Sequence, residues 1–258
     1  MSWYTPVPVA ADLSAELATG WTARAGGAHM LVPDGCVDVL WLSTGRIVVC
    51  GPETSGWSFE LPAGTEAVGV RFRPGLAAAA LGLDTPGALN RRIELADVLG
   101  DRTQRILLER MDGAASAGQR LHLLQDRIRE RLRTVPPPRP VHGSARTAAL
   151  VSGMLGDDPA SPVAELARAA GLSERQLHRR CVSAFGYGPA VLRRILRLQR
   201  FLRMARHPAA TTDLSVLAAM AGYTDQPHLN RDCRALAGVS PRVLLGLELS
   251  LDLGGATA

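Results

Sequence analysis

Arginine, histidine and amide side chains gather on the outer faces of two segments in the last third of the chain. Helical spacing places Arg175, His178 and Arg179 of the first segment opposite an apolar stripe. The outer face of the second segment is also basic and rich in amides: Gln226, His228, Asn230, Arg231 and Arg234. Guanidinium and amide groups form paired hydrogen bonds with base edges in the DNA major groove. These residue types therefore indicate nucleic-acid recognition.

Each polar face belongs to a sequence unit that occurs twice. The pattern Val163-x-x-Leu166-Ala167-x-x-Ala170-Gly171 returns as Leu214-x-x-Leu217-Ala218-x-x-Ala221-Gly222, and Cys181-x4-Gly186-x-x-Pro189 returns as Cys233-x4-Gly238-x-x-Pro241. Each copy predicts a helix, a tight turn at a glycine and a second helix. Ser173 is expected to cap the second helix of the first copy, and Thr224 or Asp225 that of the second. Such a unit is typical of a helix-turn-helix, although two helical hairpins of an α-helical repeat protein are the alternative.

The inner faces of the second helices carry an apolar stripe in both copies: Leu177, Cys181 and Phe185 in the first, and Leu229, Cys233 and Leu236 in the second. The two thiols lie in separate motifs, too far apart to form a disulfide, which needs Cα atoms within roughly 7 Å. We interpret both cysteines as small buried hydrophobes.

Positive charge is concentrated in the part of the chain that holds the repeat. Residues 1–145 contain 15 Arg and 15 acidic residues, whereas residues 146–258 contain 14 Arg and 9 acidic residues. The chain has no Lys, so all 29 of its basic residues are Arg, the side chain best suited to bidentate contact with phosphate or guanine. A genome rich in Ala and Arg explains the absence of Lys, but it does not explain the segregation of charge.

Residues 144–247 resemble the C-terminal DNA-binding domain of the AraC/XylS family of bacterial transcription regulators. The matching pieces are Gly171-Leu-Ser-Glu-Arg-Gln-Leu-His-Arg-Arg180, the arginine-rich stretch from Ala190 to His207, Gly222-Tyr-Thr-Asp-Gln-Pro-His-Leu-Asn-Arg231 and the closing Gly-Val-Ser-Pro241. The resemblance implies an all-α domain of two helix-turn-helix motifs joined by a linker helix. It implies double-stranded DNA as the partner, activation rather than repression, and RNA polymerase as a second partner of an activator.

Positions that match the family's DNA-contacting residues follow from the same resemblance: Ser173, Arg175, Gln176, His178, Arg179, Arg194, Arg197, Gln226, His228, Asn230 and Arg231. The sequence departs from the family pattern in two respects. Cys181 and Cys233 stand where the family usually has a buried Phe, and Pro227 stands where many relatives have a polar residue.

The first half of the chain is predicted to be rich in β-strands up to about residue 74 and helical after it, as a sandwich or barrel-like domain with trailing helices. Five short runs are bounded by turn sequences: residues 28–32, 36–42, 46–50, 57–61 and 67–73. The segments Leu31-Val-Pro-Asp-Gly-Cys-Val-Asp-Val-Leu-Trp41 and Val70-Arg-Phe-Arg-Pro-Gly-Leu-Ala-Ala-Ala-Ala-Leu-Gly82 are similar to the N-terminal sensory domain of a subset of AraC-type regulators. The whole fold is thus expected to be α+β.

Four residues of this half are candidates for an effector pocket. Arg71 and Arg73 share one face of a predicted strand, opposite the apolar Val68, and Trp41 and Trp57 offer rigid aromatic surface. A hydrophobic core is the ordinary alternative for both Trp residues. The sequence names no effector and indicates no cofactor.

The domain boundary is predicted at the proline-rich stretch. We expect a domain over 1–133 for effector binding or oligomerisation, an extended linker over 134–143, the DNA-binding domain over 144–247 and a tail over 248–258. A homodimer formed through the first domain is left open, as is an effector-free helical interaction module. No apolar run is long enough to span a membrane and no secretion signal is visible, so a cytoplasmic protein is expected.

The sequence gives little support for a metal site or for enzymatic catalysis. Asp34, Cys36 and Asp38 alternate on one strand, with His29 and Cys50 on neighbouring runs, so a thiol-responsive or metal-responsive regulator stays open as an alternative. The four cysteines show no Cys-x-x-Cys spacing, which argues against a structural zinc site. Motifs of nucleophilic catalysis, phosphate loops and zinc peptidases are absent from the sequence, so no enzymatic activity is expected.

Overall fold

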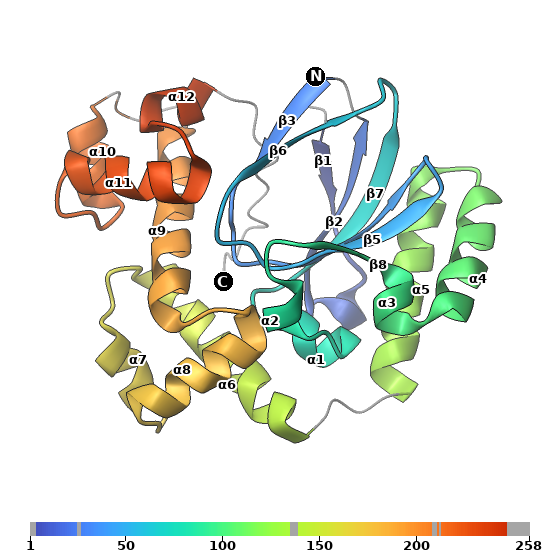
Figure 1. The fold of residues 1–258 in the computed structure, drawn as a ribbon, viewed down its shortest axis with the longest axis horizontal. Helices are drawn as coiled ribbons and strands as arrows, with labels where there is room; N and C mark the ends of the chain where they lie inside the picture. The colour runs from blue at the N-terminus through green and yellow to red at the C-terminus, as the bar shows by residue number, and fades with distance from the viewer. Residues whose placement is uncertain (1–3, 25–26, 135–138, 208–210, 212, 247–258) are drawn as a thin grey trace.

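The computed structural model describes residues 4–24, 27–134, 139–207, 211 and 213–246, and it divides them into a β-rich part and a helical part (Figure 1). The predicted tail lies outside the described residues, as do residues 135–138 of the predicted linker. The α+β organisation agrees with the fold class expected from the sequence.

A six-stranded antiparallel sheet forms the centre of the first part. Its strands pair in the order β1 (Tyr4–Val7), β2 (Leu17–Arg24), β7 (Glu66–Phe72), β4 (Asp38–Leu42), β5 (Arg46–Cys50) and β8 (Arg92–Glu94). A second, two-stranded sheet pairs β3 (Gly27–Leu31) with β6 (Trp57–Leu61). The five strands expected from the sequence are present within two residues of their predicted ends, whereas β1, β2 and β8 were not predicted.

Alternation along the strands of the larger sheet separates its two faces. In β7, Val68, Val70 and Phe72 enter the main core of this part, while Arg71 points to the other side. Helices pack on the core face: α1 (Ala77–Leu81), α3 (Leu95–Leu99), α4 (Asp101–Asp112) and α5 (Ala117–Thr134). The opposite face is left for side chains that line a pocket.

Close contact between two residues shapes that second face. A Cβ atom placed on Gly69 would come within 2.3 Å of the Trp21 indole, so only glycine lets the ring lie flat against β7. The short helical elements η1 (Ala11–Leu13) and α2 (Thr85–Ala88) complete the first part.

Helices alone build the second part of the molecule, and they share one apolar core. In chain order they are α6 (Arg139–Asp157), α7 (Val163–Ala169), α8 (Glu174–Phe185), α9 (Pro189–Ala205), α10 (Leu214–Met220), α11 (Gln226–Ala237) and α12 (Pro241–Gly246). In Figure 1 the α7–α8 pair and the α10–α11 pair lie toward opposite ends of α9.

The predicted extended linker over 134–143 is wrong in its second half. Helix α6 begins at Arg139, so Pro140 falls in its first turn. Proline is tolerated there because the first N–H groups of a helix have no partner within the helix. Pro140 is therefore compatible with a helix that begins at Arg139.

Candidate functional site

The two predicted helix-turn-helix units form as the repeat indicates. Gly171 has a φ of 65° and Gly222 a φ of 89°, the left-handed conformation that the tight turns need. Ser173 and Gln176 close a capping box at the start of α8, and Asp225 caps α11 by accepting a hydrogen bond from the His228 N–H.

Burial separates the two sides of each second helix as predicted. The apolar stripes are fully or almost fully buried in both α8 and α11: Leu177, Cys181, Phe185, Leu229, Cys233 and Leu236. Arg175, His178 and Arg179 are exposed on α8, and Arg231 is exposed on α11. Each motif thus turns a basic face to solvent.

Some of the expected DNA contacts also have structural roles. The Ser173 hydroxyl accepts the Gln176 N–H, while the Gln176 side-chain oxygen accepts hydrogen bonds from Ser173. Gln226 accepts a hydrogen bond from the Ser215 hydroxyl, which links α11 to α10. Asn230, like Gln226, is half-buried. Contact of these side chains with DNA stays a prediction.

Arg197 differs from what the resemblance implies. Its side chain is only 8% exposed, and its guanidinium donates to Asp232 of α11 over 3.1 Å and lies over the Tyr223 ring. The guanidinium is enclosed by protein in this conformation, so the predicted contact of Arg197 with DNA would require this ion pair to open. Arg194 also donates to Asp232, over 2.9 Å, but its side chain is 40% exposed.

His228 lies beside the same cluster. Burial and the positive charge of Arg197 lower its pKa, against the opposing effect of Asp232. Its ring packs edge-on against Tyr223. At neutral pH the imidazole is therefore uncharged, and it adds a hydrogen-bonding group to α11 but no positive charge.

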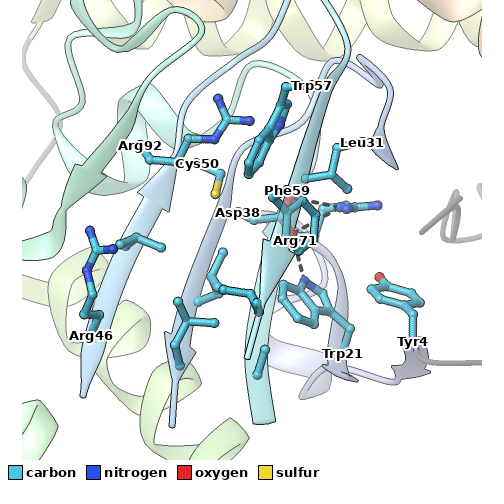
Figure 2. A pocket seen from close by; sticks show the side chains of 15 residues that line it. Tyr4, Trp21, Leu31, Asp38, Arg46, Cys50, Trp57, Phe59, Arg71 and Arg92 are labelled. Carbon is cyan, nitrogen blue, oxygen red and sulfur yellow. Dashed lines mark hydrogen bonds and ion pairs between the residues drawn. The ribbon is translucent and has the colours of Figure 1, made fainter. Parts of the chain in front are cut away.

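A pocket of about 280 Å³ lies in the first part of the molecule, between the larger sheet and the β3–β6 sheet (Figure 2). Four aromatic side chains and six aliphatic ones line it: Tyr4, Trp21, Trp57, Phe59, Leu31, Leu40, Leu42, Val48, Leu61 and Ala67. Its polar lining residues include Asp38, Arg46, Cys50, Arg71 and Arg92. This composition is usual for a site that holds a small organic molecule.

Two of the four residues predicted for the effector pocket line it. Trp57 and Arg71 line it as predicted. Trp41 does not: it is 3% exposed in the core on the opposite face of the sheet, with Arg120 over its ring. Arg73 follows the end of β7 and donates to the Ser14 carbonyl. Strand alternation corrects the Trp41 prediction, because it places Trp41 on the same face as Val39, in the core. The Arg73 prediction fails for another reason: β7 ends at Phe72, one residue before it.

An ion-pair cluster closes one side of the pocket. Arg71 contacts Asp38 at 3.2 Å, and the Trp21 indole N–H donates to Asp38 over 2.8 Å (Figure 2). Arg71 also contacts Asp34, at 3.3 Å. The two carboxylates raise the pKa of Arg71 despite its burial, so the guanidinium stays charged. Burial raises the pKa of Asp38.

A second ion pair lies next to the Arg71 cluster. The Arg92 guanidinium stacks over the Trp57 ring at 3.4 Å and donates to Glu53. Burial raises the pKa of Glu53 to about 8, and the charge of Arg92 opposes that rise.

Thiol or metal chemistry is not supported by this part of the structure. Burial raises the pKa of Cys36, and it raises that of Cys50 to about 12, so neither is a thiolate at neutral pH. In the described part of the chain, no three His, Cys, Asp or Glu side chains are grouped so as to hold a metal ion.

Contacts join the pocket wall to the DNA-binding helices. The Gly56 N–H, next to Trp57, donates to the Leu236 carbonyl in α11, and the buried Gln199 side chain of α9 donates to the Pro33 carbonyl over 2.7 Å. Val32 is buried in the core of the helical part. The loop that carries Asp34 and the strand that carries Trp57 thus both touch the second part.

Comparison with known proteins supports this division. Residues 166–246 match a helix-turn-helix domain model, HTH_18, and residues 7–94 match a domain of unknown function, DUF6597. No curated protein matches the sequence. None of the helices in the described ranges is both long and apolar enough to cross a membrane.

The chain aligns with solved structures of ToxT from Vibrio cholerae at low identity. ToxT of strain O395 is 9% identical, with a TM-score of 0.45 over 90% of this chain and 99% of that chain. ToxT bound to (E)-4-(8-methylnaphthalen-1-yl)but-3-enoic acid is 9% identical, with a TM-score of 0.47 over 96% and 100%. Unsaturated fatty acid bound ToxT of strain SCE256 is 10% identical, with a TM-score of 0.45 over 93% and 98%. The match over residues 166–246 and the doubled motif identify the C-terminal part of the chain as a helix-turn-helix domain of the AraC type.

Proposed function

We propose that this regulator binds a specific DNA site with α8 and α11 and that a small molecule in the N-terminal pocket controls it. Two second helices with exposed basic faces, held at opposite ends of α9, carry this proposal. A helix-turn-helix reads bases through its second helix, and two such helices on one scaffold reach successive major-groove segments on one face of the DNA.

The proposed base-reading group lies on the outer faces of the two helices: Arg175, His178 and Arg179 on α8, and the half-buried Gln226 and Asn230 with the exposed Arg231 on α11. Ser173, Gln176, His228 and Arg194 are assigned to the border of the contact, where backbone phosphates lie. Arg197 is left out, because its ion pair with Asp232 encloses it.

Effector control is proposed because the pocket wall continues into the contacts with the helical part. A ligand that moves Trp57 also moves Gly56, whose N–H holds the end of α11. A ligand that shifts Arg71 shifts Asp34, which lies in the loop that packs on α9. The population of DNA-binding conformations would then depend on pocket occupancy. We propose activation of transcription, with RNA polymerase as the further partner, and a homodimer through the N-terminal domain stays an additional proposal.

Selection of bound fragments from the host genome, followed by titration of the full chain against the selected site, tests the DNA-binding proposal. A DNA binder loses affinity steeply as salt rises, because phosphate counterions return to the DNA. We expect a linear fall of log K with log salt and a selected site at least about 10³-fold tighter than random DNA. An interaction module without DNA function would enrich no sequence.

A further inference from the structure

The charges around the pocket differ from those of a site that captures a charged ligand. Each arginine of the lining already contacts an acidic side chain: Arg71 with Asp34 and Asp38, Arg92 with Glu53, which is ionised above its pKa of about 8, and Arg46 with Glu94 over 2.9 Å. An anionic ligand would have to displace one of these carboxylates. For Arg71, whose side chain is 7% exposed, displacement would leave a buried carboxylate without its partner, which is strongly unfavourable.

A cationic ligand meets the opposite difficulty. Asp38 is the carboxylate in the pocket lining, and it already accepts hydrogen bonds from Arg71 and from the Trp21 indole N–H. The aromatic faces could attract a cation, but the Arg92 guanidinium already covers the Trp57 ring. A second cation beside Arg71 and Arg92 would be repelled at short range.

Size and shape limit the ligand further. An apolar cavity of about 150 Å³ holds a single benzene ring. The present volume of about 280 Å³ is therefore suited to about two fused rings. Tyr4 and Trp21 lie together on one side with ring centroids 5.5 Å apart, and Trp57 and Phe59 lie on the β6 side at 4.9 Å. Flat aromatic walls favour a flat ligand.

Two buried donors of this lining, the Trp57 indole N–H and the Arg92 Nε–H, have no hydrogen-bond acceptor among the described residues. A buried donor without an acceptor is costly, and a carbonyl or ether oxygen of a ligand would satisfy it.

We propose that the pocket takes an uncharged, flat ligand of about two rings that carries one hydrogen-bond acceptor. This inference rests on the proposed effector function of the same pocket. It adds the chemical class of the effector, which neither family model states.

Three probes of one shape and different charge test it on the full chain: 2-acetylnaphthalene, 2-naphthoate and 2-(aminomethyl)naphthalene. Calorimetric titration at pH 8.5, above the pKa of about 8 of Glu53, keeps the carboxyl partner of Arg92 mostly ionised. We expect 2-acetylnaphthalene to bind at least about tenfold more tightly than either charged probe. Tryptophan fluorescence should change with it, because Trp21 and Trp57 line the site.

A matched pair of variants locates the binding. Ala67 is buried in the lining, so Ala67→Phe should fill the pocket and abolish binding, whereas Ala63→Phe, in the exposed turn before β7, should leave the affinity unchanged. Circular dichroism confirms that both variants fold. If Ala67→Phe does not fold, the Leu40→Trp variant, which fills the same pocket from β4, is used in its place.

Tighter binding of the naphthoate or of the amine, or no binding of any probe at millimolar concentration, would overturn the ligand class. Equal loss in the Ala63 and Ala67 variants would overturn the location. DNA affinity of the unliganded chain is measured in parallel. A retained selected DNA site with a failed probe series rejects this inference alone, whereas loss of sequence-specific DNA binding rejects the proposed function.

Discussion

Arg197 of α9 donates to Asp232 of α11 over 3.1 Å, and both side chains are almost fully buried. This ion pair fixes the second helix-turn-helix on the helix that links the two motifs. Asp232 also accepts a hydrogen bond from Arg194, so one carboxylate anchors two guanidinium groups. The spacing of the two base-reading helices therefore depends on a contact that involves no base.

Removal of that carboxylate should loosen the second motif selectively. Asp232→Ala leaves the buried Arg197 without its carboxylate partner, which is expected to lower the local opening free energy by about 3–5 kcal/mol. Hydrogen exchange is the measurement: amides of α10 and α11 should exchange faster, while those of α7 and α8 should not change. Glu165→Ala, at an exposed position of α7, is the control. Unchanged exchange in α11 would show that the pair contributes little.

The two helix-turn-helix units could be predicted from the sequence because the same pattern of residues occurs twice. The helix-turn-helix units are specified by glycine positions, caps and apolar spacing within about 27 residues. Arg197 could not be placed in the same way. Its burial depends on Asp232, 35 positions away, and a basic residue in an arginine-rich helix gives no local sign of an ion pair.

The residues that line the pocket could also be predicted only in part from the sequence. Strand alternation places Trp57 and Arg71 correctly, but Trp21 lies in β2, whose sequence Leu-Ala-Thr-Gly-Trp-Thr-Ala-Arg has weak β propensity. That strand forms because both of its edges pair, with β1 and β7. Tertiary pairing of this kind is not encoded in any short segment, so Tyr4 and Trp21 were missed.

Base reading by the first motif is tested on α8. Arg175→Ala or Arg179→Ala should cost about 1–3 kcal/mol on the selected site and relax its sequence preference, because each removes a bidentate donor. Competition binding against random DNA is the measurement. Arg105→Ala, at an exposed position of α4 in the other domain, serves as the control. An equal loss on selected and random DNA would assign the residue to phosphate contact only.

The second motif should discriminate bases less than the first. Pro227 is exposed in the first turn of α11, where it has no donor for a base or phosphate, and the lowered pKa of His228 leaves its ring uncharged at neutral pH. Substitution of each base pair in the selected site should therefore cost less in the half that contacts α11. Greater stringency in that half would contradict the prediction.

The buried thiols of both motifs should be insensitive to oxidation. Burial raises the pKa of Cys181 and of Cys233 to about 12, so the reactive thiolate is negligible from pH 6 to 9. DNA binding in mild peroxide should equal that of the untreated protein across this range. Cys181→Ser and Cys233→Ser should each lower stability by about 1–3 kcal/mol, because they bury a hydroxyl. Peroxide-dependent release of DNA, lost in either variant, would instead identify a thiol sensor.

Titration of Glu53, beside the pocket, should make the free energy of unfolding depend on pH. Its folded pKa of about 8 exceeds its ordinary value of 4.5, so the folded state binds a proton more tightly than the unfolded state between these values. The contribution of Glu53 to stability therefore falls as pH rises from about 4.5 and levels off above about 8.

Glu53→Gln keeps the shape of the side chain and removes the titration. Relative to the wild type, the variant should be more stable at pH 9 than at pH 6 by at least about 1 kcal/mol, since one pKa unit corresponds to about 1.4 kcal/mol. Thermal unfolding at both pH values measures the difference, and Glu60→Gln, an exposed carboxylate on β6, provides the control. A difference of the opposite sign would mean that the ion pair with Arg92 dominates over burial and holds Glu53 ionised throughout this range.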